Sequence, residues 1–155
     1  MSAASAGLLG ARPEGQLVEF FIERCNERLV EYIDSNAFRE APDDSKLFSC
    51  IKTRLKMNAP HVASGTWAQA MAIMARPENV STLLRQQHGM VSEIARATRT
   101  EPASNASDLA YKAMIAAAYG VAEVSMLSDK SDGFHDTWRT LERELALWER
   151  RGSRR

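Results

Sequence analysis

The chain has 155 residues, which is enough for one domain with a buried hydrophobic core. Its 20 basic and 20 acidic residues cancel, so the overall charge favours neither nucleic acid nor an anionic membrane. A hydrophobic content of 45% with 26% charged residues is typical of a soluble globular protein, and no apolar run approaches the roughly 18 residues of a membrane span.

Apolar residues recur with helical spacing along nearly the whole chain, and no alternating strand pattern stands out. The spacing predicts an all-α protein of about seven helices, namely a short one at the N-terminus and others over 14–34, 45–60, 66–75, 78–98, 108–127 and 131–151. Ser45 is the predicted cap of the 45–60 helix, and "NAFREAPDD" and "EPASNAS" are predicted loops. The residues predicted to face inward include Leu17, Phe20, Phe21, Leu29, Ile33, Leu47, Phe48, Ile51, Leu55, Leu83, Leu84, Val91 and Ile94.

The last two predicted helices differ in pattern. The segment 108–127 is rich in Ala and Met around its whole circumference, which is typical of a central helix with neighbours on several sides. The segment 131–151 is strongly amphipathic, with charged residues between the members of one apolar stripe. The stripe consists of Phe134, Trp138, Leu141, Leu145 and Trp148.

Residue constellations that carry catalysis are missing from the sequence. His61, His88 and His135 stand apart, no HExxH pair occurs, and no Gly-rich phosphate loop is present. Cys25 and Cys50 are too few and too far apart for a disulfide framework or a zinc site, so both are predicted to be buried thiols. The sequence therefore predicts a protein that is not an enzyme, with no catalytic residue, no metal site and no cofactor.

Soft apolar residues at helix-facing positions are the remaining candidates for function. Methionine fills irregular space and tolerates variable ligands, so a bundle lined by Met and Ala is suited to a hydrophobic molecule. Plain core packing is the alternative explanation for each of these residues. The candidate lipid-binding residues are Leu55, Met57, Trp67, Met71, Met74, Leu84, Met90, Met114, Ala117 and Met126.

Several stretches resemble a known family. The segment "SDKSDGFHDTWRTLE", with Asp136, Thr137, Trp138 and Arg139, is similar to the signature of the coenzyme Q biosynthesis accessory proteins, the ninth member of the Coq set. Further matches come in the order of the family and cover almost the whole chain: "LVEFFIERCNERL", "TRLKMNAP", "WAQAMAIMARPENV" and "KAMIAAAYGVAEV".

The resemblance implies a fold and a function. Members of that family have the TetR-like fold, bind isoprenoid lipids that include ubiquinone precursors, and present them to the di-iron demethoxyubiquinone hydroxylase. They do so as peripheral proteins on the matrix side of the inner mitochondrial membrane, without binding nucleic acid. The resemblance also implies that the candidate residues above form a lipid pocket, and that the chain pairs through its last two helices as a homodimer.

The chain departs from the family at both ends and at the partner surface. Residues 1–12 resemble only the last stretch of a helix-turn-helix-like unit, 13–151 form the expected lipid-binding domain, and 152–155 are a basic tail whose membrane contact is an open question. Asp108 and Leu109 replace an expected Trp-Tyr pair, so the predicted partner-binding residues are Asp108, Leu109 and Lys112. Two alternatives remain, namely the ligand and dimerisation domain of a TetR-like transcription regulator and an inactive truncated paralogue.

Overall fold

The computed structural model describes residues 12–100 and 104–152, and helices make up nearly all of this part of the chain. The elements are α2 (Pro13–Ile33), α3 (Asn36–Glu40), α4 (Asp43–Lys56), α5 (Ala59–Ala63), α6 (Thr66–Met74), α7 (Pro77–Thr98), α8 (Asn105–Ser128), the 3₁₀ turn η1 (Asp132–Phe134) and α9 (His135–Gly152). The all-α prediction is confirmed, since no strand occurs within the described ranges. The predicted short N-terminal helix and most of the predicted basic tail lie outside the described residues.

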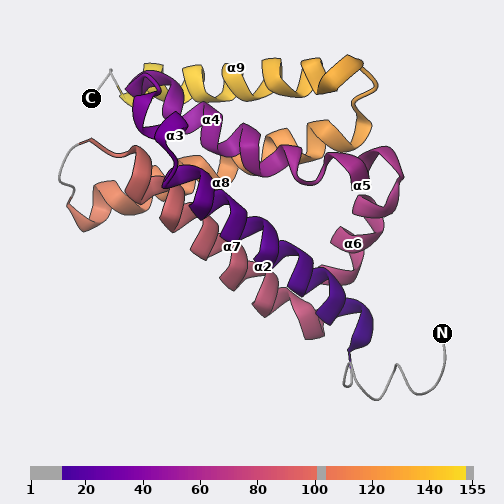
Figure 1. Cartoon of the computed structure of the whole chain (residues 1–155). Helices are drawn as coiled ribbons and strands as arrows, with labels where there is room; N and C mark the ends of the chain where they lie inside the picture. The colour runs from indigo at the N-terminus through magenta and orange to yellow at the C-terminus, as the bar shows by residue number, and fades with distance from the viewer. Residues whose placement is uncertain (1–11, 101–103, 153–155) are drawn as a thin grey trace.

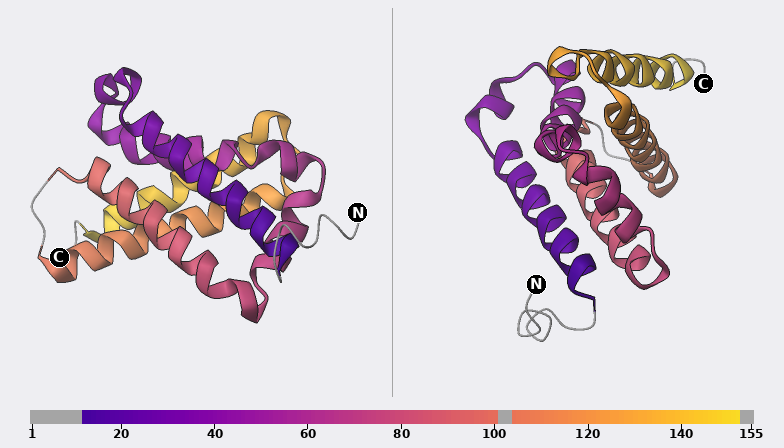
Figure 2. Two further views of the ribbon diagram at one scale, coloured as in Figure 1. Left: turned by 60° about the horizontal axis from the view of Figure 1, so that its bottom comes forward. Right: turned by 90° about the vertical axis from the view of Figure 1, so that its right-hand side faces the viewer.

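The long helices pack as a bundle in which α8 and α9 form an antiparallel pair (Figure 1). Helix α2 lies along α7 and also contacts α4, while α4 contacts both α7 and α9. In the right-hand view of Figure 2, α2 and α8 lie on opposite sides of the bundle with α7 between them. The short helices α5 and α6 close one end of the bundle, where α6 packs on α2.

Each of the five long helices contributes a fully buried side chain to one continuous core. These side chains are Leu29 of α2, Ile51 of α4, Ile94 of α7, Ile115 of α8 and Leu141 of α9. Burial of one such side chain contributes about 1.5–3 kcal/mol to folding, so this core holds the bundle together. A second, smaller cluster between α2 and α6 consists of Ile22, Trp67 and Met74.

Polar caps and prolines determine where several helices begin. Pro13 and Pro77 occupy the first turns of α2 and α7, where the missing N–H costs no hydrogen bond. The hydroxyl of Ser104 accepts a hydrogen bond from the Ser107 N–H at 3.3 Å and caps α8. The prediction that Ser45 caps α4 is wrong, because the helix already begins at Asp43 and the Ser45 hydroxyl donates back to the Pro42 carbonyl.

The prediction of an inward position is wrong for three large residues. Leu17, Phe20 and Leu84 are 64%, 61% and 59% exposed. In α2 the buried positions are Gly15, Ile22, Cys25, Leu29 and Ile33, and helical spacing places Leu17 and Phe20 on the opposite side of the helix. In α7, Leu83 packs against the cluster of Ile22, Trp67 and Met74, whereas Leu84, the next residue, points to solvent.

Helix α8 has one face that the described chain leaves uncovered. Leu109, Val121, Val124 and Leu127 are all exposed, and helical spacing places them on the same side of α8. We call these four residues the α8 outer face. The expectation that α8 is covered on several sides is therefore wrong for the described chain, in which α8 packs mainly on α7 and α9.

The prediction that both cysteines are buried is confirmed. Cys25 is 2% exposed on α2, and Cys50 is fully buried on α4. Both are free thiols. They lie in the interior of the protein and contribute small hydrophobic volumes to it.

Candidate functional site

A cluster of polar side chains lies inside the bundle where α2, α4, α6 and α8 approach one another. We call it the buried polar cluster. It consists of Asn26, Arg54, Asn58, Trp67, Tyr119 and Glu123. Arg54 is 2% exposed and Asn58 is fully buried, so the cluster places a charged group where water does not reach it. Such a group is stable only when its hydrogen bonds are made inside the protein.

The hydrogen bonds of the cluster connect Arg54 to Glu123 through an amide. The Arg54 guanidinium donates to Asn26 Oδ1 at 2.9 Å and to Asn58 Oδ1 at 3.0 Å. Asn58 Nδ2 in turn donates to Glu123 Oε1 at 3.4 Å. The same carboxylate oxygen accepts hydrogen bonds from the Trp67 indole at 3.2 Å and from the Tyr119 hydroxyl at 3.4 Å.

Burial shifts the titration of both acidic groups in this cluster. Burial raises the pKa of Glu123, although the hydrogen bond from Trp67 and the charge of Arg54 oppose part of that shift. Burial also raises the pKa of the Tyr119 hydroxyl, so the phenol stays protonated and acts as a donor. The cavity beside the cluster has a volume of only about 20 Å³, far below the roughly 300–1,000 Å³ of ligand pockets. In this conformation the cluster is a connection between helices rather than a lipid site.

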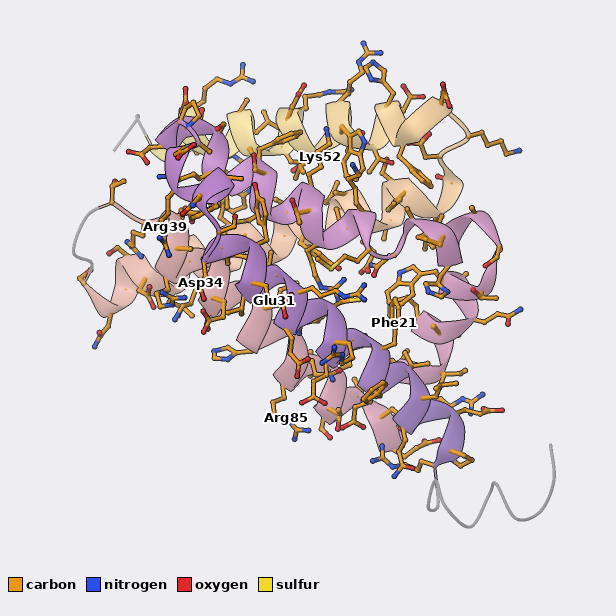
Figure 3. All side chains as sticks on the ribbon, viewed as in Figure 1. Phe21, Glu31, Asp34, Arg39, Lys52 and Arg85 are labelled. Carbon is orange, nitrogen blue, oxygen red and sulfur yellow. The ribbon has the colours of Figure 1, made fainter. Side chains whose placement is uncertain are left out.

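Three larger hollows lie on the surface of the bundle, and the one of about 360 Å³ between α2 and α7 is lined mostly by polar side chains. The other two have mainly apolar walls. The α2–α6 groove has a volume of about 420 Å³ and is walled mainly by apolar side chains of α2 and α6. Figure 3 shows Phe21 pointing from α2 toward α5 and α6, and its ring lies 5.8 Å from that of Trp67 and 4.6 Å from that of His61. The lining residues are Leu17, Val18, Phe20, Phe21, Arg24, His61, Thr66, Trp67, Gln69, Ala70 and Ile73.

The second hollow, the α8–α9 groove, has a volume of about 650 Å³. It lies between the start of α4, the end of α7, the first half of α8 and the second half of α9. Leu47, Tyr111, Met114, Leu145 and Trp148 provide its apolar surface. Both grooves have volumes in the range of small-molecule sites.

The structure distributes the ten candidate lipid-binding residues over different environments. Leu55, Met90 and Met126 are buried in the main core, and Met74 is buried in the smaller cluster. Trp67, Met71 and Met90 come together around the small cavity of the buried polar cluster. Met114 lines the α8–α9 groove and Trp67 the α2–α6 groove, while Met57 is partly buried and Leu84 and Ala117 are exposed. Lipid contact by this set stays a prediction.

The three candidate partner-binding residues lie together near the start of α8. The Asp108 carboxylate accepts from Lys112 Nζ at 2.9 Å and from the Arg99 guanidinium at 3.2 Å. The hydrogen bond from Lys112 and the nearby charge of Arg99 lower the pKa of Asp108. Leu109 is 70% exposed beside this ion-pair network, and Val121, Val124 and Leu127 extend the apolar face along α8. In the sequence, the segment "GVAEVSML" contains few polar residues, and this composition indicates that the apolar face continues to the end of α8.

The "SDKSDGFHDTWR" motif forms the turn between α8 and α9. One Asp129 oxygen accepts from the Ser131 N–H at 2.7 Å and the other from the Thr137 N–H at 2.8 Å, and each also accepts from that residue's hydroxyl. The Trp138 indole donates to the Gly133 carbonyl at 2.8 Å. Gly133 has a φ of 60°, in the left-handed region that favours glycine. The motif therefore serves the geometry of the turn.

Two kinds of feature are absent from the described residues. No group of three or more His, Cys, Asp or Glu side chains in residues 12–100 and 104–152 is placed to hold a metal ion. Over the same ranges, no helix combines the length and apolar character needed to cross a membrane. The fold, with its long terminal helix pair and its surface grooves, is that of an all-α protein of the TetR-like helical-bundle class.

Comparison with known proteins shows which family this chain is similar to. The sequence model of the COQ9 family matches residues 80–150. The chain is 28% identical to the mitochondrial ubiquinone biosynthesis protein COQ9 of Xenopus tropicalis, over 94% of this chain and 47% of that protein. It is 27% identical to the Homo sapiens protein of the same name, over 94% of this chain and 46% of that protein. The chain is a relative of the COQ9 proteins, and the resemblance that its motifs indicate is confirmed.

A third animal relative gives the same result. The chain is 28% identical to the Drosophila melanogaster mitochondrial ubiquinone biosynthesis protein COQ9, over 88% of this chain and 43% of that protein. The chain thus spans about half the length of the curated relatives it matches. All three relatives are named as mitochondrial proteins.

Proposed function

We propose that this chain is a non-catalytic, lipid-binding accessory protein of ubiquinone biosynthesis. It binds isoprenoid quinone intermediates and presents them to the di-iron demethoxyubiquinone hydroxylase on the matrix side of the inner mitochondrial membrane. The observation that carries the proposal is the similarity to mitochondrial COQ9 proteins, which extends over 94% of the chain. The assignment to this pathway depends on that similarity.

The surface grooves support the lipid-binding part of the proposal. A polyprenyl tail is almost insoluble in water, because each exposed CH₂ costs about 0.8 kcal/mol. A carrier must therefore offer a continuous apolar surface of ligand size, and grooves of about 420 and 650 Å³ supply it. The buried polar cluster is already engaged in its own hydrogen bonds, which agrees with a binding role rather than a catalytic one.

The α8 outer face supports the partner-binding part of the proposal. Exposed apolar side chains that are contiguous on one helix mark protein interaction sites. Leu109, at 70% exposed, is flanked by the ion pairs of Asp108 with Arg99 and Lys112. An apolar centre with a charged rim is the usual anatomy of a specific protein interface.

The test is mass spectrometry of the lipids extracted from the purified protein, compared with an unrelated protein prepared in the same way. We expect ubiquinone, its demethoxy precursor or another isoprenoid lipid at about one molecule per chain. Added quinone is expected to raise the melting temperature, because a ligand that binds the folded state stabilises it. A protein that carries no more lipid than the control and shows no thermal shift would contradict the proposal and would favour an inactive paralogue.

A further inference from the structure

We infer that the buried polar cluster binds one internal water molecule, which connects Gln86 of α7 to Glu123 of α8. The observation behind this inference is a buried acceptor on Gln86. Its Oε1 atom is shielded from solvent, and none of the described residues donates a hydrogen bond to it. A buried acceptor in a native protein almost always has a partner, and ordered water supplies one where the protein does not.

The orientation of the Gln86 amide follows from its other contact. Gln86 Nε2 donates to the main-chain carbonyl of Glu19 at 2.9 Å. A carbonyl oxygen only accepts hydrogen bonds, so turning the amide over would break this contact and bring two oxygen atoms together. Oε1 is therefore the end of the amide that needs a donor.

The cavity beside the buried polar cluster has the size of a single water molecule. Its volume of about 20 Å³ is slightly larger than the roughly 10–15 Å³ that one water needs, and it is too small for a larger ligand. Gln86 lines this cavity, and about half of the lining residues are polar. The polar residues of the wall are Asn26, Arg54, Gln86, Gln87, Tyr119 and Glu123.

The wall of the cavity offers the two to four polar partners that a buried water requires. The Arg54 guanidinium has five N–H groups, and the bonds to Asn26 and Asn58 use two of them, so it has further protons to donate. Glu123 has two carboxylate oxygens, and Oε1 receives the hydrogen bonds of the cluster. A water that accepts from Arg54 and donates to Gln86 Oε1 and the Glu123 carboxylate makes three hydrogen bonds, which is typical of a buried water.

The charges on the wall select a neutral molecule over an ion. Arg54 and Glu123 line the same cavity, so a cation would face the guanidinium and an anion would face the carboxylate. The charge of Arg54 also acts on Glu123 directly, because it opposes part of the rise in the pKa of that carboxyl group. A water molecule both donates and accepts, and it brings no charge into the interior.

The water closes a ring of hydrogen bonds that includes α2, α4 and α7. Asn26 Nδ2 of α2 donates to the main-chain carbonyl of Gln86 at 3.2 Å, and Asn26 Oδ1 accepts from Arg54 of α4 at 2.9 Å. Gln86 and Arg54 are therefore joined on one side by Asn26 and on the other side by the water. Through Glu123, the same water also links α7 to α8.

Oxygen-17 magnetic relaxation dispersion of the solvent tests the inference, because it counts long-lived internal waters and does not respond to exchanging hydroxyl protons. Folded proteins hold about one buried water per 27 residues, so the test compares variants rather than one absolute count. Gln86→Met replaces the amide by a thioether, which is a weak acceptor. We expect the count of internal waters to fall by one in this variant. A crystal structure of the original chain is expected to show a water within hydrogen-bond distance of Gln86 Oε1.

Ser92→Ala is the matched control. The Ser92 hydroxyl oxygen is also buried without a partner among the described residues, and it lies on the same helix as Gln86, but it does not line the cavity. We expect Ser92→Ala to keep the number of internal waters of the original chain. Circular dichroism shows whether both variants are folded. If Gln86→Met does not fold, the crystal structure of the original chain decides the question.

Three results would overturn the inference. An equal number of internal waters in Gln86→Met and in the original chain would mean that no water binds at this residue. Electron density for a protein group against Gln86 Oε1 would mean that the protein itself satisfies the acceptor. A melting temperature that rises with sodium chloride but not with choline chloride, and only when Gln86 is present, would identify a bound cation instead. None of these results concerns the lipid or the partner, so the proposed function is tested separately.

Discussion

Glu123 is the residue on which the buried polar cluster depends most. Its Oε1 atom is the shared acceptor for Trp67, Tyr119 and Asn58. Glu123→Ala removes the acceptor of Trp67 and Tyr119, leaves Asn58 Nδ2 with only the Tyr119 hydroxyl at 3.5 Å, and leaves Arg54 without its opposite charge in the cluster. We expect it to lower the free energy of unfolding by about 2–3 kcal/mol, measured by urea denaturation at pH 7.

The matched variant Glu123→Gln keeps the accepting oxygen and removes the charge, so its loss is expected to be smaller. The pKa of Glu123 is raised in the folded state, so its contribution to stability is greatest below the pKa of the unfolded chain. That contribution decreases as pH rises through the folded pKa. Equal losses in the two variants at every pH would contradict the assignment of Glu123 as the shared acceptor.

Asp129 titrates in the opposite direction. Burial alone would raise its pKa, but hydrogen bonds from the hydroxyls and backbone N–H groups of Ser131 and Thr137 lower it to about 2 from a usual 3.8. The stabilisation from Asp129 is therefore present above pH 3.8 and is lost as pH falls toward 2. Asp129→Asn is expected to cost about 1–2 kcal/mol at pH 7, and the difference from the original chain should shrink below pH 4.

Asp132→Asn is the control for this prediction, because Asp132 is an exposed acid in the same turn. It is expected to leave the urea midpoint unchanged at both pH values. A pH-independent loss in Asp129→Asn would show that packing, rather than the carboxylate hydrogen bonds, accounts for the effect.

At the scale of helices, Asn79 joins α2, α6 and α7. The Asn79 side chain donates to the Ile73 carbonyl at 2.9 Å and accepts from the Arg12 guanidinium at 2.6 Å. A Cβ atom at Gly15 would lie 2.5 Å from Asn79 Oδ1, so the close approach of α2 and α7 requires glycine here. We expect Gly15→Ala to lower the free energy of unfolding by about 1–3 kcal/mol in chemical denaturation.

Gly89 provides the matched comparison inside α7. A Cβ atom there would meet nothing within 4 Å, and alanine favours the helix. Gly89→Ala is therefore expected to raise the free energy of unfolding by about 0.5–1 kcal/mol. If Gly15→Ala and Gly89→Ala change the free energy of unfolding in the same direction, the contact between Gly15 and Asn79 does not restrict the packing of α2 on α7.

The long helices could be predicted from the sequence because they repeat their apolar pattern over several turns. Pro77 and the turn at Gly133 gave clear boundaries for α7 and α9. The helices α3 and α5 were predicted as non-helical or as part of a longer element, because each has five residues and shows no periodicity. The start of α8 was placed late, since Ser104 caps the helix from within a segment of typical loop composition.

The candidate site was harder to predict than the fold. Arg54 and Asn58 are buried, yet a polar residue carries no sequence signal that separates an interior position from a solvated one. Their partner Glu123 lies 65 residues beyond Asn58, and only the tertiary structure brings the two together. The two grooves could not be predicted for the same reason, because segments that are distant in the sequence form each of them.

At the scale of the whole molecule, the α8 outer face predicts how partner binding responds to mutation. Leu109→Glu and Val124→Glu place a charge in the centre of the proposed interface, where desolvation of an unpaired charge is costly. We expect each to weaken binding of the purified di-iron hydroxylase by about tenfold or more in calorimetry, with an unchanged melting temperature.

Leu84→Glu serves as the control for that measurement. Leu84 is 59% exposed but lies on α7 rather than α8. The Leu84→Glu variant should therefore bind the hydroxylase as the original chain does. Full binding by Leu109→Glu and Val124→Glu would mean that the partner docks elsewhere on the bundle.

The two buried thiols make the protein its own reporter of transient opening. Burial raises the pKa of both Cys25 and Cys50, the latter to about 12, so neither thiol is ionised near neutral pH. An alkylating reagent therefore reacts only with molecules in which α2 or α4 has separated from the bundle. The rate of alkylation at each cysteine, measured by mass spectrometry, therefore reports how often its helix opens, and no engineered probe is needed. A bound lipid that holds the bundle closed would slow the alkylation of both cysteines.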